Sequence, residues 1–446
     1  MDQIRGTVAI LANVLYFTPD PAEIERRERK VAFYDEKIAA GRAGENVARL
    51  LGEIRGEEQK LALLTSEEFR SYRLRGTAVE LFFASGVSLF FAFDSPAVRK
   101  EFHAVLRSLA LPRLEPFLGE TAAERWSRDS SEARWHRGEL SNLEYVLRVN
   151  RLAGRSYNDL SQYPIVPWVL SNYTSPLLDL RNPANFRRLD RPMGGQSEKR
   201  FSAMQQKFEM MRQLEAEEAA DPLADPLRLL CPPPRHHATL PSSSATVLWS
   251  LLRLEPYATL HVVLQGGRFD RPDRQCASVA GAWRGACENE NDCRELVPEW
   301  YALPAVFQNV NKFDLGPLQG AAERLGAIRL PDWASSAYDF VLSMQDAFES
   351  EFVGSHLHQW IDLVFGALQR GAGAEKAGNV FPHLAYLTEA QAEALARDQP
   401  DLYLQAAEIV ENFGQIPAQV GFPAEIERRS APRPTAHGKR TGSATA

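Results

Sequence analysis

Serine, histidine and acidic residues occur throughout this sequence, but not at the spacings that catalysis requires. A nucleophile elbow reads GxSxG, and this pattern does not occur. HExxH does not occur either; His356 and His358 are two residues apart, so a helix directs them to different faces rather than to one metal ion. We therefore predict that the chain is not an enzyme. The alternative is an enzyme whose site converges from distant positions, which requires a deep pocket with titratable groups.

Cofactor and metal motifs are incomplete as well. His236 and His237 follow a proline-rich turn without a third ligand nearby. GQSEKR and HGKRTG each contain part of a phosphate-loop motif, but neither forms GxxxxGK[ST] after a strand. Asp270 and Asp273 in GGRFDRPD lack the other oxygen ligands of calcium, and the neighbouring arginines suit them as surface ion-pair partners. We predict no cofactor and no bound metal.

Composition excludes further classes of function. The 446 residues carry 51 Lys+Arg and 58 Asp+Glu, a net charge of -7, which argues against nucleic acid as a partner. The first residues lack the continuous apolar core of a signal peptide, and no apolar run is long enough to span a bilayer. The four cysteines form no CxxC pair, which favours reduced thiols over a disulfide or metal set.

Residues 1–115 have the pattern of a small β domain. Residues 6–17, GTVAILANVLYF, alternate in polarity, and AVELFFASGVSLFFAF predicts two strands around a Ser85-Gly86 turn. Ser95 can cap the following helix, with Pro96 at its first position. We predict a β-barrel or sandwich closed by one helix. Residues 20–60 are charged and helix-prone, which indicates a long surface insertion.

The remainder predicts a linker over 116–138, a mainly helical domain over 139–425 and a disordered basic tail over 426–446. ELSNLEYVLRVNRLAG has helical apolar spacing, and Ser355 can cap the apolar helix LHQWIDLVFGALQR. FSAMQQKFEMMRQLEAEEAA carries a stripe with two methionines, for which core packing is favoured over partner binding.

The segment SYNDLSQYPIVPWVLSNY, residues 156–173, fits no regular element. Pro164 and Pro167 exclude a helix and a central strand, yet the apolar content requires burial. Burying Trp168 hides about 200 Å², roughly 5 kcal/mol at about 25 cal/mol per Å². We expect an extended, irregular chain through the core. Its interleaved polar residues are expected to hydrogen-bond that main chain rather than a ligand: Asn158, Asp159, Ser161, Gln162 and Asn172.

These residues resemble the signature of BEACH domains. LAGRSYNDLSQYPIVPWVLSNYTS is followed in the family's order by DLRNPANFRRLDRPMG, SLLRLEPYATLHVVLQGGRFDRPDR, LVPEWYALP, NVNKFDLG, LHQWIDLVFGALQRG, NVF and ENFGQIPAQV. These motifs cover about residues 135–422 and are highly specific. The preceding β domain resembles the PH-like domain that members of this family carry immediately upstream.

The resemblance implies an α+β multidomain fold, in which a PH-like β domain docks on a mainly α-helical BEACH domain with extended segments in its core. It implies protein partners at a groove between the two domains, no catalytic activity, and a cytoplasmic scaffold in vesicle trafficking, lysosome or granule biogenesis, or autophagy. The residues expected to line or support this groove are Tyr157, Asn158, Asp159, Gln162, Tyr163, Trp168, Arg253 and Glu255.

Departures from the family pattern modify this expectation. Met1 falls where a first PH-like strand and its loop should already have passed, so we expect a PH-like domain truncated at its N-terminus. The WD-repeat propeller in which the family usually ends is not found in this sequence after residue 425. Leu240-Pro241-Ser242 replaces the family's His-Tyr-Ser, and Pro382-His383 has the opposite order. The alternative function is a peripheral membrane or phosphoinositide-binding adaptor on endomembranes, supported by the basic tail and a local cluster of basic residues: Arg181, Arg187, Arg188, Arg191, Lys199 and Arg200.

Overall fold

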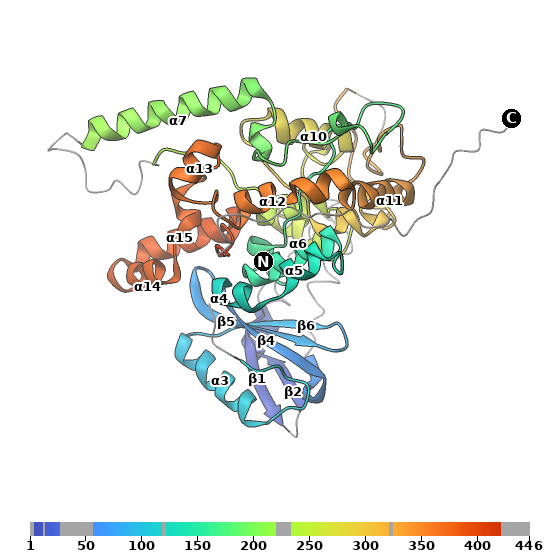
Figure 1. The fold of residues 1–446 in the computed structure, drawn as a ribbon. Coiled ribbons are helices and arrows are strands. Elements are labelled where there is room, and N and C mark those ends of the chain that lie inside the picture. The colour runs from blue at the N-terminus through green and yellow to red at the C-terminus, as the bar shows by residue number, and fades with distance from the viewer. Residues whose placement is uncertain are drawn as a thin grey trace.

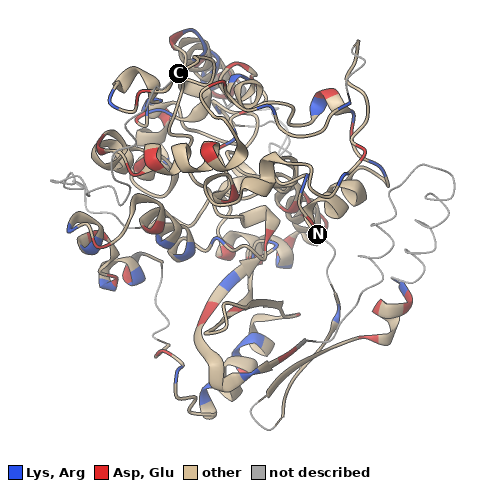
Figure 2. Cartoon of the chain, turned by 90° about the vertical axis from the view of Figure 1, so that its right-hand side faces the viewer, with Lys and Arg blue, Asp and Glu red and all other residues tan. Residues whose placement is uncertain are grey.

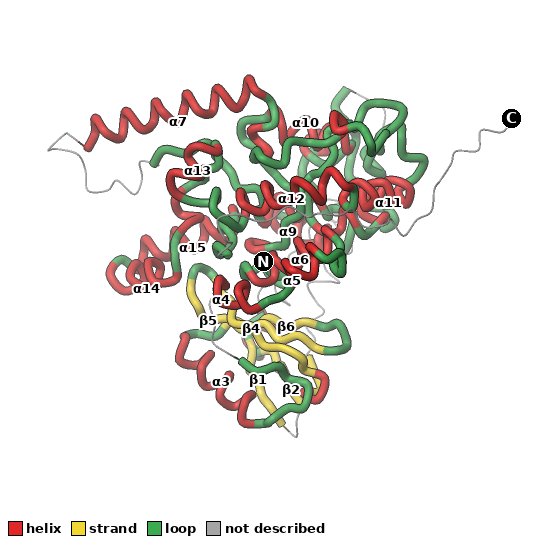
Figure 3. The backbone as a smooth tube through the Cα atoms, viewed as in Figure 1, coloured by secondary structure: helices red, strands yellow, loops and turns green. Residues whose placement is uncertain are grey.

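The computed structural model describes residues 4–11, 14–26, 57–117, 122–219, 233–320 and 324–420. A β-rich part, formed by the first of these residues, lies beside a larger helical part (Figure 1). Helices alternate with long irregular connections in the helical part (Figure 3). This mixed architecture agrees with the predicted α+β class. In the described residues no helix is long and apolar enough to cross a membrane.

The β-rich part contains two antiparallel sheets of three strands among its described residues, in the orders β1-β2-β3 and β4-β5-β6. The predicted hairpin around Ser85-Gly86 is present as β5 and β6. Residues 6–17, however, are two paired strands rather than one, and the end of the expected 20–60 insertion is strand β3; residues 27–56 lie outside the described part. The strands are β1 Gly6–Leu11, β2 Val14–Pro19, β3 Glu57–Lys60, β4 Leu64–Tyr72, β5 Arg75–Phe83 and β6 Ser88–Ala92.

Helix α3, Pro96–Ser108, packs on these sheets and begins as predicted. The Ser95 side chain accepts a hydrogen bond from the main-chain N–H of Val98, and Pro96 is its first residue. Leu106 on its inner face is fully buried with Leu81 and Val79 of β5. The helix therefore covers the core of the β-rich part.

Residues 116–138, predicted to be a linker, instead contain two short helices. These are α4, Ala122–Arg128, and α5, Ser131–His136. Both helices are rich in polar residues, but each contributes one tryptophan to the core of the helical part: Trp126 from α4 and Trp135 from α5. Trp135 stacks on Tyr145 at 4.6 Å and donates to Asn142 Oδ1 at 2.7 Å. Burial of one aromatic side chain from each helix holds this segment against the domain.

The helical part is built around a large apolar cluster that draws on most of its elements. Helix α12 is capped by Ser350, not by Ser355 as predicted, because the helix begins a turn earlier. The methionine-bearing stripe lies on α7, whose Met204 and Phe208 are buried while Met210 and Leu214 are exposed. The α-helices are α6 Asn142–Leu152, α7 Glu198–Ala219, α8 Ser244–Ser250, α9 Tyr257–Leu264, α10 Val279–Glu288, α11 Ala337–Phe348, α12 Glu351–Val364, α13 Gly371–Ala377, α14 Glu389–Asp398 and α15 Pro400–Phe413.

The proline-containing segment crosses the core as expected. Every residue of 159–170 is buried, and after the 3-10 turn Leu160–Gln162 the chain is extended and irregular. The prediction that interleaved polar side chains hold this main chain is confirmed only at its two ends, where Asp159 accepts from the Ser161 N–H at 2.9 Å and Asn172 accepts from the Ser175 N–H at 3.1 Å. The extended stretch between them is held from outside the segment. Asn150 of α6 bonds both main-chain groups of Ile165 at 2.8 Å, and Val166 exchanges two hydrogen bonds with Leu296.

Candidate functional site

A cleft of about 1030 Å³ lies between the β-rich and helical parts, and we call it the interdomain cleft. One wall comes from β4 and β5, and the other from α6 and residues 155–157. The C-terminal end of α3, residues 115–117 and α4 close the remaining sides. Its lining mixes arginines and carboxylates with apolar side chains such as Phe69, Phe117 and Leu147.

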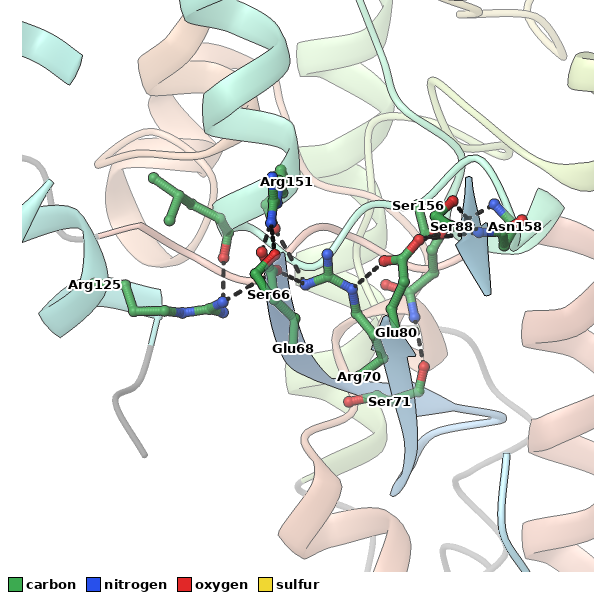
Figure 4. Close-up of polar contacts among 12 residues, drawn as sticks. Ser66, Glu68, Arg70, Ser71, Glu80, Ser88, Arg125, Arg151, Ser156 and Asn158 are labelled. Carbon is green, nitrogen blue, oxygen red and sulfur yellow. Dashed lines mark hydrogen bonds and ion pairs between the residues drawn. The ribbon is translucent and has the colours of Figure 1, made fainter. Parts of the chain in front are cut away.

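One wall of the cleft is fixed by Glu68 of β4, which three arginines surround (Figure 4). Its carboxylate lies 2.5 Å from Arg151 Nε, 2.8 Å from Arg70 Nη1 and 3.3 Å from Arg125 Nη1. Burial alone would raise the pKa of Glu68, but the Arg70, Arg151 and Arg125 guanidiniums hold it below its usual value. Because Arg125 belongs to α4 and Arg151 to α6, this one carboxylate links β4 to two helices.

Glu80 of β5 is the second polar contact between the two parts (Figure 4). Its carboxylate pairs with Arg70 at 2.8 Å and accepts hydrogen bonds from Ser156 Oγ at 2.6 Å and Asn158 Nδ2 at 3.1 Å. The same amide of Asn158 donates to Ser88 Oγ of β6 at 2.8 Å. Glu80 is almost fully buried, and its bonds with Arg70 and Ser156 are therefore shielded from water.

An apolar contact follows at the turn between β4 and β5. Arg73 and Leu74 both have positive φ, 47° and 69°, which is uncommon for residues other than glycine. Leu74 is buried in a cluster with Ala406 and Val410 of α15. The Arg73 carbonyl accepts a hydrogen bond from Tyr403 Oη at 3.0 Å. The strained turn is thus held by contacts with the C-terminal helices.

The structure distributes the predicted site residues between the cleft, the contact between the two parts, and the core. Tyr157 is half-exposed and lines the interdomain cleft, where its ring meets Tyr163 edge-on at 5.4 Å. Asn158 bonds the β-rich part, as does Gln162, whose amide reaches the Ser71 carbonyl at 3.4 Å. Asp159 caps its own 3-10 turn.

The remaining predicted site residues lie outside the cleft lining. Tyr163 and Trp168 are core residues with no exposed surface. Arg253 is buried and donates to the carbonyls of Gly326 and Cys276, both at 2.8 Å, and burial lowers its pKa. Glu255 accepts hydrogen bonds from Thr259 at the start of α9. Arg253 does bond other segments, as expected, whereas Glu255 bonds its own.

Sequence reasoning missed the cations and carboxylates that build the cleft. Glu68 and Arg70 lie on β4, for which no strand was predicted, and Glu80 lies in the predicted hairpin, while Arg125 and Arg151 lie in segments interpreted as linker and helix. Three charged residues of β4 and β5 are buried: Glu67, Arg70 and Glu80. Buried charges require partners, and Arg70 and Glu80 find them in each other and in the helical part.

The basic cluster predicted to contact membranes is not one surface. Arg187 pairs with Glu295 at 2.7 Å with no exposed side-chain area, and Arg200 is buried against the carbonyls of Ala286 and Asp292. Arg181, Arg188 and Arg191 each have an acidic neighbour within 3.3 Å. Blue and red residues are interspersed over the described helices (Figure 2). The basic tail lies outside the described residues.

Metal ligands do not converge in the described residues, where no group of three His, Cys, Asp or Glu side chains could hold an ion. His236 and His237 instead bond Gln205 and the Gly378 carbonyl, each at 3.0 Å. Asp270 has Arg274 at 3.8 Å, a surface pair as predicted, while Asp273 accepts from the main chain of Gln319. Cys276, Cys287 and Cys293 are buried free thiols.

Comparison with known proteins assigns both parts of the chain. Residues 133–427 match the Beige/BEACH domain, and residues 1–107 match the PH domain associated with Beige/BEACH. The chain therefore belongs to the BEACH family, as its motifs indicated.

Curated relatives agree with this assignment. The chain is 36% identical over 392 residues to BEACH domain-containing protein B of Arabidopsis thaliana, covering 85% of this chain and 14% of the relative. It is 34% identical over 435 residues to a putative neurobeachin homolog of Caenorhabditis elegans, covering 96% of this chain and 16% of the relative. The chain thus spans about one sixth of the length of the relatives it matches.

Proposed function

We propose that this chain is a non-catalytic protein-interaction scaffold in vesicle trafficking, and that the interdomain cleft is its protein-binding surface. Membership of the BEACH family supports the scaffold role. The processes it serves are lysosome or granule biogenesis, or autophagy, and it acts in the cytoplasm on endomembranes. The observation that carries the proposal is a cleft lined jointly by the PH-like and BEACH domains.

The contacts beside the cleft support a binding surface of fixed shape. Glu68 and Glu80 tie both walls together, and Leu74 anchors the PH-like domain to α15. Hydrogen-bonded, buried ionic groups define one geometry because any other arrangement leaves a charge without a partner. A docking surface assembled from two domains is thereby pre-organised, which reduces the entropy lost on binding.

The experiment is an affinity pull-down from cytosol with the full chain and two matched variants. Tyr157→Ala removes an aromatic side chain that is 50% exposed at the cleft, whereas Tyr338→Ala removes one that is 66% exposed elsewhere. We expect Tyr157→Ala to lose proteins that wild type and Tyr338→Ala retain, with the melting temperature within a few degrees of wild type. An identical set of captured proteins for all three chains contradicts the cleft as the binding surface.

A further inference from the structure

The interdomain cleft contains a free strand edge. Among the strands that the structure describes, β4 is at the edge of its sheet and pairs only with β5. Successive residues of a strand direct their main-chain groups alternately to its two sides. The carbonyls of Thr65 and Ser71 accept hydrogen bonds from outside the sheet, at 2.9 and 3.4 Å. Thr65 and Ser71 lie at the two register shifts of β4, and between them the pairing is regular, with Glu67 and Phe69 on the same outer edge and both lining the cleft.

The register of the sheet gives the same orientation. The main-chain N–H of Phe83 binds the Val87 carbonyl at 2.9 Å, on the β6 side, so odd-numbered residues of β5 face β6 and even-numbered residues face β4. The even-numbered residues of β5 pair with Ser66, Glu68 and Arg70 of β4. The odd-numbered residues between these three, Glu67 and Phe69, are turned away from β5.

These outward main-chain groups are open to a ligand. Within the described part of the chain, the N–H and C=O groups of Glu67 and Phe69 have no hydrogen-bond partner beyond the sheet. Both residues line the cleft. Glu67 retains 5% exposure although its side chain has none, so the exposed surface is main chain. An unpaired edge of this kind is a template for another strand.

The charges around this edge favour an acidic ligand. Three carboxylates that line the cleft are paired with arginines: Glu67 with Arg107, and Glu68 and Glu80 with the network described above. Arg151 of α6 belongs to that network. Arg148, one turn earlier on the solvent-facing side of α6, also lines the cleft. Arg148 is exposed and has no ion-pair or hydrogen-bond partner among the described residues.

Apolar surface lies beside the same edge. The Phe69 ring packs on Phe117 at 4.5 Å, and Leu147 and Leu152 of α6 line the opposite wall. An extended peptide directs alternate side chains to opposite sides. Such a peptide can therefore place apolar side chains on these walls and an acidic side chain toward Arg148.

We propose that the interdomain cleft binds an extended, acidic segment of a partner protein, which adds to the free edge of β4 as a further strand. This inference rests on the proposed scaffold function and specifies the chemistry of its ligand. Main-chain hydrogen bonds to Glu67 and Phe69 supply affinity, and Arg148 of α6 selects acidic side chains.

The probe is a phage library of random 12-residue peptides, selected on the immobilised full chain. We expect the enriched peptides to be rich in Asp and Glu and poor in Lys and Arg. One enriched peptide, labelled with fluorescein, is then titrated by fluorescence anisotropy, and its affinity should fall as salt is raised. Failure to enrich acidic peptides overturns the proposal.

Two substitutions at one position test the strand edge. Phe69→Pro and Phe69→Ala both remove the ring, but only proline also removes the outward N–H, and an edge strand tolerates proline there. We expect binding to Phe69→Pro to be about five- to tenfold weaker than to Phe69→Ala, the effect of one lost hydrogen bond. Equal affinities of two folded variants, verified by circular dichroism, overturn strand addition.

The preference for acidic peptides is tested with a substitution on α6, outside the sheet. This test can therefore be made even if Phe69→Pro does not fold. Arg148→Glu should lower the affinity for the acidic peptide at least about threefold. The control is Arg284→Glu, the same change at an exposed position of α10 outside the cleft, which should leave the affinity unchanged. Vesicles with 30% phosphatidylserine serve as competitor, and displacement of the peptide by these vesicles overturns the proposal in favour of a lipid ligand.

The two proposals fail in different ways. If Tyr157→Ala abolishes partner capture but Phe69→Pro and Arg148→Glu do not change it, the scaffold function stands and the acidic strand is wrong. If no cleft variant changes partner capture, the scaffold surface lies elsewhere and the proposed function fails with it.

Discussion

At the scale of single residues, the carboxylate of Glu295 accepts hydrogen bonds from three different segments of the BEACH domain. It accepts from Arg187 at 2.7 Å, from the main-chain N–H of Trp168 at 3.1 Å and from Trp360 Nε1 at 3.0 Å. The side chains of Arg187 and Glu295 are 0% and 3% exposed. One buried ion pair thus connects the extended segment to α12 and to the loop that carries Arg187.

We expect Glu295→Ala to lower the free energy of unfolding by about 3–5 kcal/mol, because it leaves the buried charge of Arg187 without a partner. The matched control is Glu198→Ala. Glu198 is 72% exposed and pairs with Arg191 at 2.9 Å, and its loss should cost less than about 1 kcal/mol. Urea denaturation followed by tryptophan fluorescence measures both values. Equal unfolding midpoints would contradict the structural role of Glu295.

The sequence predicted which residues of this region are buried but not what they bind. Two prolines and a tryptophan were sufficient to predict an extended buried chain over 160–168. The acceptor for the Trp168 main chain, however, is 127 positions away. A local pattern contains no information about a partner that only the tertiary fold brings close. The nearby polar side chains that were predicted to hold this chain therefore do so only at its two ends, through Asp159 and Asn172.

At the scale of elements, the N-terminal half of α7 is attached to the domain by two neutral histidines. His236 stacks on Phe208 at 4.2 Å and bonds Gln205 at 3.0 Å, both on α7. His237 donates to the Gly378 carbonyl at 3.0 Å, near Arg200 at the start of the helix. Burial lowers the pKa of His236 to about 4 and that of His237 to about 3.

These pKa shifts predict a loss of stability in acid. Both histidines are neutral in the folded chain but take up protons below about pH 6.5 when unfolded. Their contribution is therefore complete above pH 6.5, and each should lose about 2 kcal/mol as the pH falls from 7 to 5. The measurement is urea denaturation at both pH values for wild type and the double variant His236→Gln, His237→Gln. An identical pH slope for the two chains would show that these histidines do not contribute.

Elements with a local signal were predicted well. The Ser95-Pro96 start of α3 and the β5-β6 hairpin depend on contacts within a few residues, and both are present. Helices α4 and α5 were missed because their polar residues suggest a linker, while their stability comes from burying Trp126 and Trp135 in a distant core. Either Ser350 or Ser355 could cap the start of α12, and the helix begins after Ser350, which places Val353 in the apolar core.

At the scale of the whole molecule, the contacts of the turn between β4 and β5 show how the PH-like domain holds its position. Leu74 is 1% exposed and lies among residues of α14 and α15, in a backbone conformation that leucine rarely adopts. Its burial offsets the strain of the turn. The cleft network of Glu68 and Glu80 lies midway along the same strands, so the two domains are joined both at the turn and at the middle of β4 and β5.

Leu74→Asp should therefore separate the domains. Aspartate accepts positive φ more readily than leucine, so the substitution does not add strain to the turn but places a charge in an apolar contact. We expect a loss of about 2–4 kcal/mol, unfolding in two calorimetric transitions rather than one, and a larger radius of gyration in small-angle scattering. Leu177→Asp is the control, because Leu177 is 81% exposed and should tolerate the same charge. A Leu74→Asp chain that unfolds and scatters like wild type would mean that the turn does not hold the domains together, and the cleft would then depend on Glu68 and Glu80 alone.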